Sequence, residues 1–340
     1  MGPHTGTMNV EAALHDALPA RDPREYPVVI PAVGGDLCGV FADPGTPTNE
    51  TAVLLLVGGG FIPMTHRNRM WVRLSRRLVN HGCPVLRFDY HGIGESKGAT
   101  PDYVLDRPFV EDVEGAVQWL RGRGVTQIVM VGSCFGARAI LAAGERVPEL
   151  YAAALLSPPL RRGALGEQAA TRFAETLTVR GYLRKAMQGR VLRRLRDPQW
   201  RARYWRVARV KLQRLSESVS GGRPSRKFSP RLAWVSEAFL RPVQALPHRG
   251  VRLCFMYGDQ EAHYEEFQRA REAGIDELFQ GADGLVEVRT VAGVLHGFTT
   301  CAIQDRAIDE VSEWILQLPI GEGRWAADDR ANARGVVGHA

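Results

Sequence analysis

The stretch that most constrains this chain is Gly132-Ser133-Cys134-Phe135-Gly136, because the sequence pattern changes from strand to helix across it. The apolar run 127–131 before it is typical of a buried strand. Residues 137–143 after it are good helix formers with an apolar stripe. The pattern predicts a strand, a tight turn and a helix. Cys134 would lie at the tip of the turn, and the two glycines would allow a sharp bend and close packing.

Strand-like apolar runs alternate with helical patterns along most of the chain. The first two runs, joined around Gly34-Gly35-Asp36, predict an antiparallel hairpin. The alternation that follows predicts a doubly wound, mostly parallel α/β sheet. The expected strands are 26–31, 37–41, 52–57, 83–89, 127–131, 152–156, 251–257 and 285–291, and the expected helices include 70–79, 111–121 and 302–318.

The alternation stops between residues 160 and 246, which predicts an insertion in one large domain. Residues 23–159 and 247–319 would then form the core, and the insertion would be a helical lid placed before the strand at 251–257. We expect residues 1–22 to be a flexible lead-in and residues 320–340 to be a disordered tail, because they have little apolar surface to bury.

Composition excludes several classes of protein. Apolar content of 45% and charged content of 24% are typical of a soluble globular protein, and no apolar run reaches the roughly 20 residues of a membrane span. The first 27 residues lack the pattern of a secretory signal, so we expect a cytoplasmic protein. The five cysteines are scattered, without a C-x-x-C pair, which argues against a disulfide framework and against a zinc site. We therefore expect no metal and no other cofactor.

An exposed thiol at Cys134 needs a base and a group that orients the base. His296 is the candidate base, since it lies between the last strand and the last helix. Asp259 and Glu261 compete as the orienting acid, because both follow the strand 251–257 and either carboxylate can hold an imidazole in one tautomer. Four other histidines are expected to be solvated residues of surface loops: His66, His91, His248 and His263.

Five segments in this order resemble the α/β-hydrolase superfamily over about residues 26–318. They are the glycine-rich turn 58–61, the segment 87–96, the turn at 132–136, Gly258-x-x-Glu261 and His296-Gly297. The resemblance implies a nucleophile, an acid and a histidine in that order along the chain. In such proteins the acid usually stands three residues after the glycine, which favours Glu261 over Asp259.

In having a cysteine at the nucleophile position, the chain is similar to dienelactone hydrolases and to some hydrolase-like proteins of biosynthetic clusters. The chain differs from dienelactone hydrolases in two features. It has Ala137 where they carry a further glycine, and it has the basic insertion. The substrate of those enzymes is therefore not carried over.

The resemblance also implies an oxyanion hole. Its two donors would be the backbone N–H of Phe135 and one N–H of the Gly60-Phe61 turn. A glycine run allows the backbone to approach a substrate closely, although a simple tight turn would have the same sequence. A phosphate loop is excluded, because the G-x-x-x-x-G-K-[ST] pattern is missing.

Cysteine at this position predicts acyl chemistry through a thioester. The helix N-terminus and His296 would favour the thiolate of Cys134, a better nucleophile than a neutral hydroxyl. The expected function is an acyl-group enzyme acting on an ester or thioester, by hydrolysis, acyl transfer or cyclisation. The alternative is a catalytically silent binding protein, with Cys134 as a buried apolar residue.

The insertion carries most of the positive charge of the chain. Residues 180–231 hold 17 Lys and Arg against Asp197 and Glu217, a net charge of +15, whereas the whole chain is +7 and its remainder is −8. Apolar residues between 182 and 215 predict amphipathic helices with a cationic outer face. This face is either a solvated surface or a docking site for an acidic partner, such as an acyl carrier protein, the phosphates of coenzyme A or, less favoured, an anionic membrane surface. No recognition motif supports nucleic acid.

Overall fold

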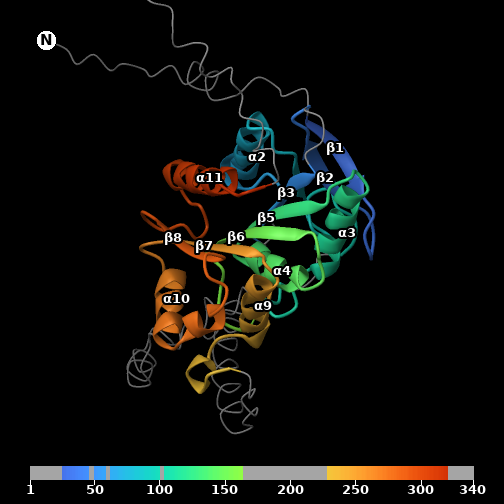
Figure 1. Ribbon diagram of the computed structural model, residues 1–340. Coiled ribbons are helices and arrows are strands. Elements are labelled where there is room, and N and C mark those ends of the chain that lie inside the picture. Colours follow the sequence, from blue (N-terminus) through green and yellow to red (C-terminus); the bar gives the residue numbers. More distant parts are fainter. Residues whose placement is uncertain (1–24, 46–49, 59–61, 100–102, 164–227, 321–340) are drawn as a thin grey trace, which may run out of the picture.

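The computed structural model describes residues 25–45, 50–58, 62–99, 103–163 and 228–320. An eight-stranded sheet runs through these residues (Figure 1). Its strands are β1 Glu25–Ile30, β2 Leu37–Ala42, β3 Thr51–Leu56, β4 Val85–Phe88, β5 Gln127–Ser133, β6 Leu150–Leu156, β7 Arg252–Gly258 and β8 Val286–Val291. Every strand expected from the sequence is present, with ends that differ by one or two residues.

The strand order is β1-β2-β4-β3-β5-β6-β7-β8. β1 pairs with β2, and β2 with β4, in antiparallel fashion, whereas every pair from β4 to β8 is parallel. Parallel strands need helical crossovers and are buried on both faces. Burial on both faces explains why five of the six residues of β3 are apolar, since all six are buried.

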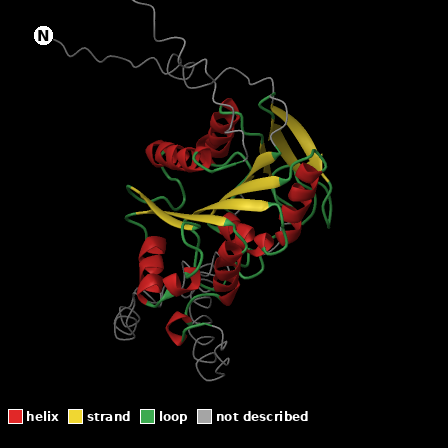
Figure 2. Ribbon diagram, in the orientation of Figure 1, coloured by secondary structure: helices red, strands yellow, loops and turns green. Residues whose placement is uncertain are grey.

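Helices cover both faces of the sheet (Figure 2). α2 and α11 pack together on one face, while α3, α4 and α9 form a layer on the other (Figure 1). α10 follows β7 and also packs against it. The helices are α2 Met70–Asn80, α3 Val110–Arg121, α4 Phe135–Gly144, α9 Glu237–His248, α10 Ala262–Glu272 and α11 Cys301–Leu316, with short 3-10 turns at η1 Arg67–Arg69, η2 Pro230–Leu232 and η3 Ile275–Phe279.

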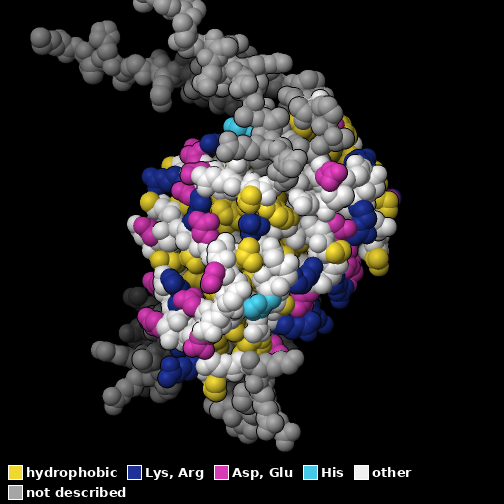
Figure 3. Space-filling model, in the orientation of Figure 1, with side chains coloured by type: hydrophobic (Ala, Val, Ile, Leu, Met, Phe, Trp, Pro, Cys, Tyr) yellow, Lys and Arg dark blue, Asp and Glu magenta, His cyan; other side chains and the backbone are white. Residues whose placement is uncertain are grey.

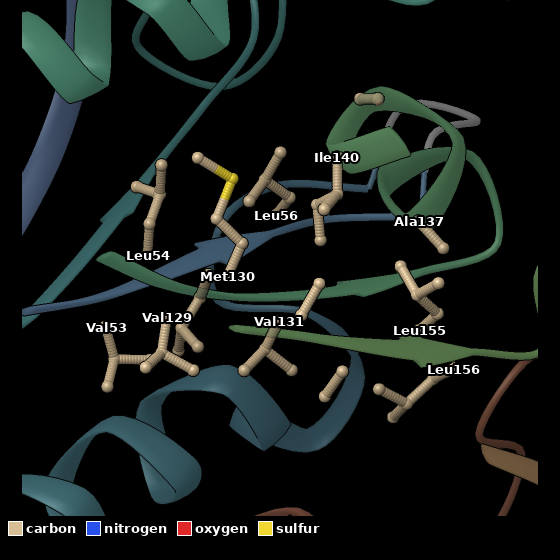
Figure 4. Packing of buried hydrophobic residues seen from close by; sticks show 14 of the residues in the cluster. Val53, Leu54, Leu56, Val129, Met130, Val131, Ala137, Ile140, Leu155 and Leu156 are labelled. Atoms are coloured by element: carbon tan, nitrogen blue, oxygen red, sulfur yellow. The ribbon is translucent and has the colours of Figure 1, made fainter. Parts of the chain in front are cut away.

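The core lies between the central strands and these two layers. Val129 and Val131 of β5 point to the face of the sheet covered by α2, and Met130 points to the α4 face (Figure 4). All three side chains are fully buried. The period-2 alternation of a strand therefore supplies apolar contacts to both layers, as a doubly wound sheet requires.

The expected insertion, residues 160–246, includes most of a helix that belongs to the core. α9 crosses residue 246, where the lid was expected to end, and packs against α4 and β7. The Ser236 N–H donates to the Leu160 carbonyl oxygen at 2.8 Å, so residues 160 and 236, on either side of residues 161–235, are neighbours. The amphipathic segment expected at 182–215 lies outside the described residues, as do residues 1–22 and 321–340.

Across the described ranges, no helix combines the length and the apolar character needed to cross a bilayer.

Candidate active site

The turn between β5 and α4 holds Cys134 in a strained backbone conformation. Its φ is 48° and its ψ is −109°, values that a residue other than glycine rarely adopts. Cys134 is the N-cap of α4, so its side chain lies at the positive end of the helix dipole. Its side chain is partly exposed, whereas Cys83 and Cys254 are buried and desolvation raises the pKa of each well above its ordinary value.

The two glycines of the turn are required by close packing. A Cβ on Gly132 would lie 2.7 Å from the Gly136 carbonyl carbon, and a Cβ on Gly136 would lie 2.6 Å from the Val57 carbonyl oxygen. Neither distance is compatible with a side chain, because backbone atoms cannot move aside. The sequence prediction of a strand, a sharp turn and a helix is confirmed here.

The carboxyl ends of β5, β6 and β7 bring three side chains to one edge of the sheet. The Cys134 N–H donates to the Leu156 carbonyl oxygen and the Ser157 N–H to the Met256 carbonyl oxygen, both at 2.8 Å. Neighbouring strands are about 4.8 Å apart. Cys134, Ser157 and the residues that follow β7 therefore lie within a few side-chain lengths of one another.

Glu261 is buried at this edge, with 3% of its surface exposed. Its Oε1 accepts a hydrogen bond from the Ser157 hydroxyl at 2.6 Å, and its Oε2 accepts one from the His296 backbone N–H at 2.6 Å. Desolvation raises the pKa of the Glu261 carboxyl, and these hydrogen bonds oppose the rise. The carboxylate is thus fixed between the end of β6 and the loop that carries His296.

Asp259, the alternative acid, is used differently. It is exposed, and its Oδ1 accepts a hydrogen bond from the Gly293 N–H at 2.7 Å. This contact closes the turn after β7 onto the loop after β8. The contacts of the two carboxylates favour Glu261 as the acid that orients His296. Asp259 instead stabilises the loop after β8.

His296 is exposed in the loop that joins β8 to α11. Neighbouring elements hold this loop at two carbonyl groups. The Gln304 amide donates to the Phe298 carbonyl oxygen at 2.8 Å, and an Arg67 guanidinium N–H donates to the Gly297 carbonyl oxygen at 3.2 Å. Phe298 itself has a φ of 47°, so the loop bends sharply just after the histidine.

The expected oxyanion hole lies partly outside the described residues, since Gly60 and Phe61 are not among them. The Phe135 N–H, the other expected donor, donates to the Gly58 carbonyl oxygen at 3.3 Å. Gly58 borders the turn closely, because a Cβ placed on it would be 3.7 Å from the Cys134 Cβ. In this conformation the end of β3 is against the candidate nucleophile, and the Phe135 N–H has an acceptor within the protein.

Two histidines expected on the surface are buried, so that prediction was wrong for them. His66 has 5% of its surface exposed and His263 has 3%. Burial lowers the pKa of His66 to about 4, so this imidazole is neutral near pH 7. Its Nδ1 accepts the Arg67 N–H at 2.8 Å, which places the ring proton on Nε2.

His263 lies two residues beyond Glu261, in the first turn of α10, and its ring contacts the ring of His296. A helical pattern over 262–272 would have indicated this position, because His263, Phe267 and Ala270 share its buried face.

The other two histidines, His248 and His91, lie outside the group formed by Cys134, Glu261 and His296. His248 is exposed at the end of α9. The prediction of a solvated histidine was also wrong for His91, because its side chain is only 13% exposed and its Nδ1 lies 2.5 Å from the Asp112 carboxylate. The segment 87–96, which contributed to the family resemblance, thereby ties the sheet edge to α3.

Metal ligands do not gather anywhere in the part of the chain that the structure describes. No group of three or more His, Cys, Asp or Glu residues there has the arrangement of a metal site.

Comparison with known proteins gives the family and the fold. A family model described as "Alpha/beta hydrolase family" matches residues 53–313. The esterase Pf2001 of Pyrococcus furiosus has a TM-score of 0.53 and 16% identity, over 86% of this chain and 91% of that chain. The proline iminopeptidase of Mycobacterium smegmatis has a TM-score of 0.50 and 15% identity, over 85% and 97%. At such identities the structural likeness concerns the fold. Among curated proteins, none matches the chain.

Proposed function

Because the chain belongs to the alpha/beta hydrolase family, we propose that it is an acyl-group enzyme whose nucleophile is the Cys134 thiol. The observation that carries this proposal is the strained backbone of Cys134 at the N-terminus of α4, with φ 48°. Strain of this kind persists where the surrounding structure imposes it, and it is concentrated at functional sites. The hydrogen-bonded Glu261 and the loop of His296 at the same sheet edge support the roles of orienting acid and base.

The proposed reaction has two steps. His296 accepts the thiol proton while the Cys134 sulfur bonds to the acyl carbon of an ester or thioester, and the proton then passes to the departing alcohol or thiol. In the second step water, an amine or a hydroxyl attacks the acyl-Cys134 thioester, and the sulfur leaves with a proton. Thioesters transfer acyl groups readily to amines, so a cysteine suits acyl transfer and cyclisation as well as hydrolysis.

Intact-mass spectrometry tests the first step. Wild type incubated with short and medium acyl thioesters should gain the mass of one acyl group, and Cys134→Ala should gain none. Cys301→Ala is the matched control, since Cys301 is exposed and is the thiol most open to adventitious acylation. If the acyl group is lost with Cys301→Ala and kept with Cys134→Ala, the nucleophile assignment is wrong.

A second candidate is a non-catalytic binding protein, and one observation favours it. The Phe135 N–H, expected to stabilise an oxyanion, donates to the Gly58 carbonyl oxygen instead. If this arrangement persists with substrate bound, Cys134 lacks a main source of transition-state stabilisation. Absence of acylation and of turnover across the thioester panel, together with unchanged complementation by Cys134→Ala, would support the binding protein.

For the substrate carrier, we propose an acidic acyl carrier protein or coenzyme A. The support is the +15 charge of residues 180–231, most of which lie outside the described residues. Acidic and basic side chains are mixed over the described face in Figure 3. Attraction between oppositely charged surfaces weakens with salt, because the Debye length falls from about 10 Å at 0.1 M to about 3 Å at 1 M.

This proposal predicts a difference in salt sensitivity between two donors. Acylation by a carrier-bound acyl group should slow by tenfold or more between about 0.05 and 0.5 M salt. Acylation by a small uncharged thioester should change little. Equal salt dependence for the two donors would contradict docking on the basic segment.

A further inference from the structure

A buried histidine next to His296 has no part in the proposed two-step reaction. His263 has 3% of its surface exposed, and its ring centroid lies 4.7 Å from that of His296, with the ring planes at 64°. This edge-to-face arrangement is the favoured geometry for neighbouring aromatic rings. It also restricts rotation of the His296 ring, which is otherwise exposed to solvent.

A carboxylate one helical turn further along α10 lies near His263. The Glu266 Oε2 lies 3.9 Å from the His263 Nδ1, at the i, i+3 spacing that brings side chains together on a helix. The Glu266 Oε1 accepts a hydrogen bond from the Arg161 Nε at 3.0 Å. The side chains of His263, Glu266 and Arg161 are 4%, 12% and 24% exposed, so solvent screens these contacts only in part.

Arg161 lies at the start of the insertion, next to residues 234–236. We call residues 160–161 and 234–236 the neck of the insertion. The preceding residue, Leu160, accepts the hydrogen bond from Ser236 that closes this neck. The Arg161 guanidinium also lies over the Trp234 ring, 5.5 Å from its centroid, and Arg269 of α10 lies 5.0 Å from the same ring. Arg161 and Trp234, near the two ends of residues 161–235, therefore both contact α10, whose N-cap is Glu261.

We propose that His263 is a positioning residue for His296, and that the Arg161–Glu266 ion pair couples this contact to the neck of the insertion. The proposal rests on the proposed role of His296 as the base. Movement of the neck would shift Glu266 and His263, and with them the ring that must accept the Cys134 proton.

The test uses the rate of alkylation of Cys134 by iodoacetamide, read by peptide mass spectrometry. His263→Ala should slow this rate by tenfold or more, because a misplacement of about 1 Å can cost about 100-fold. His263→Phe keeps an aromatic edge against His296 and should recover most of the rate. Recovery by phenylalanine distinguishes ring positioning from proton transfer by His263 itself.

The coupling to the neck is tested by Glu266→Gln and by its combination with His263→Ala. Glu266→Gln should slow alkylation by a few fold, and the double variant should be no slower than His263→Ala alone, because coupled residues are not additive. The matched control is Arg241→Gln, which removes a bidentate ion pair with Glu145 between α9 and α4. It should leave the alkylation rate unchanged.

Two further readouts keep the outcomes distinct. Thermal unfolding identifies any variant that loses its fold, and the imidazole NMR signals of His296 report ring position without any reaction. Suppose that Cys134 of the wild type is alkylated rapidly, and that His263→Ala changes neither this rate nor the NMR signals of His296. This result would overturn the inference about His263 and leave the proposed function standing. A wild-type Cys134 that reacts no faster than the exposed Cys301 would overturn the proposed function as well.

Discussion

The hydrogen bond from Ser157 to Glu261 offers the sharpest test of the site, because both partners are nearly inaccessible to water. Ser157 and Glu261 are 2% and 3% exposed, and the hydroxyl lies 2.6 Å from the carboxylate. Ser157 also has a φ of 46°, in the region that favours glycine. Ser157→Ala removes the hydroxyl and leaves the backbone strain in place.

The expected cost follows from the charge of the acceptor. A hydrogen bond to a charged group contributes about 1.5–3 kcal/mol, and water cannot replace the lost donor at a buried carboxylate. Burial already raises the pKa of Glu261, and the Ser157 hydroxyl is among the groups that lower it. In Ser157→Ala the pKa of Glu261 should therefore rise further.

The sign of the pH dependence can be derived from this shift. A carboxyl whose pKa is higher in the folded state binds a proton more tightly there, so the free energy of unfolding falls as pH rises between the unfolded and folded values. In Ser157→Ala this fall extends to higher pH. Chemical denaturation should show a loss of about 1.5–3 kcal/mol near pH 8 and a smaller loss near pH 4.

Two comparisons isolate the hydroxyl. Ser157→Gly loses the same hydrogen bond but relieves a backbone strain of about 1–2 kcal/mol, so it should be the more stable of the two variants. Ser75→Ala is the matched control, because the buried Ser75 hydroxyl has no hydrogen-bond partner among the described residues. A loss in Ser157→Ala that is independent of pH, or no larger than that of Ser75→Ala, would refute the reasoning.

Two other pairs of substitutions test the turn and the choice of acid. Gly136→Ala would place a Cβ 2.6 Å from the Val57 carbonyl oxygen, so it should destabilise by roughly 1–3 kcal/mol in chemical denaturation, whereas Gly122→Ala meets nothing closer than 3.5 Å and should be near neutral. A Gly136→Ala variant as stable as Gly122→Ala would show that the turn relaxes. Glu261→Gln should slow acylation of the thiol by roughly 100-fold and Asp259→Asn by less than about threefold, measured as single-turnover rates. The reverse order would exchange the roles of the two carboxylates.

The fold was predictable because its signals are local. Most of the parallel strands are short apolar runs, and the alternation of such runs with amphipathic helices specifies a doubly wound sheet without knowledge of which strands are neighbours. The turn at Cys134 was predictable for a related reason. A strand, two glycines and a helix within a few residues leave few backbone conformations available.

Most of α9 was assigned to the insertion because the alternation of strands and helices was expected to stop between residues 160 and 246. Pro242 and Pro247 lie inside it, and proline removes a backbone donor and disfavours a helix interior. Its buried face against α4 and β7 outweighs that local cost. Packing of this kind becomes visible only when the partners are in place.

By itself the sequence determined the strands, the doubly wound sheet, the sharp turn at Cys134, and the order of Cys134, Glu261 and His296 along the chain. Only the tertiary structure showed the different contacts of Glu261 and Asp259, added Ser157 as a hydrogen-bond donor to Glu261, and placed His263 beside His296. The physical reason is that strand and turn formation depends on neighbours in sequence. Burial and hydrogen bonding of polar side chains depend on residues that lie 35 to 104 positions apart, as the contacts of Glu261 with His296 and Ser157 do.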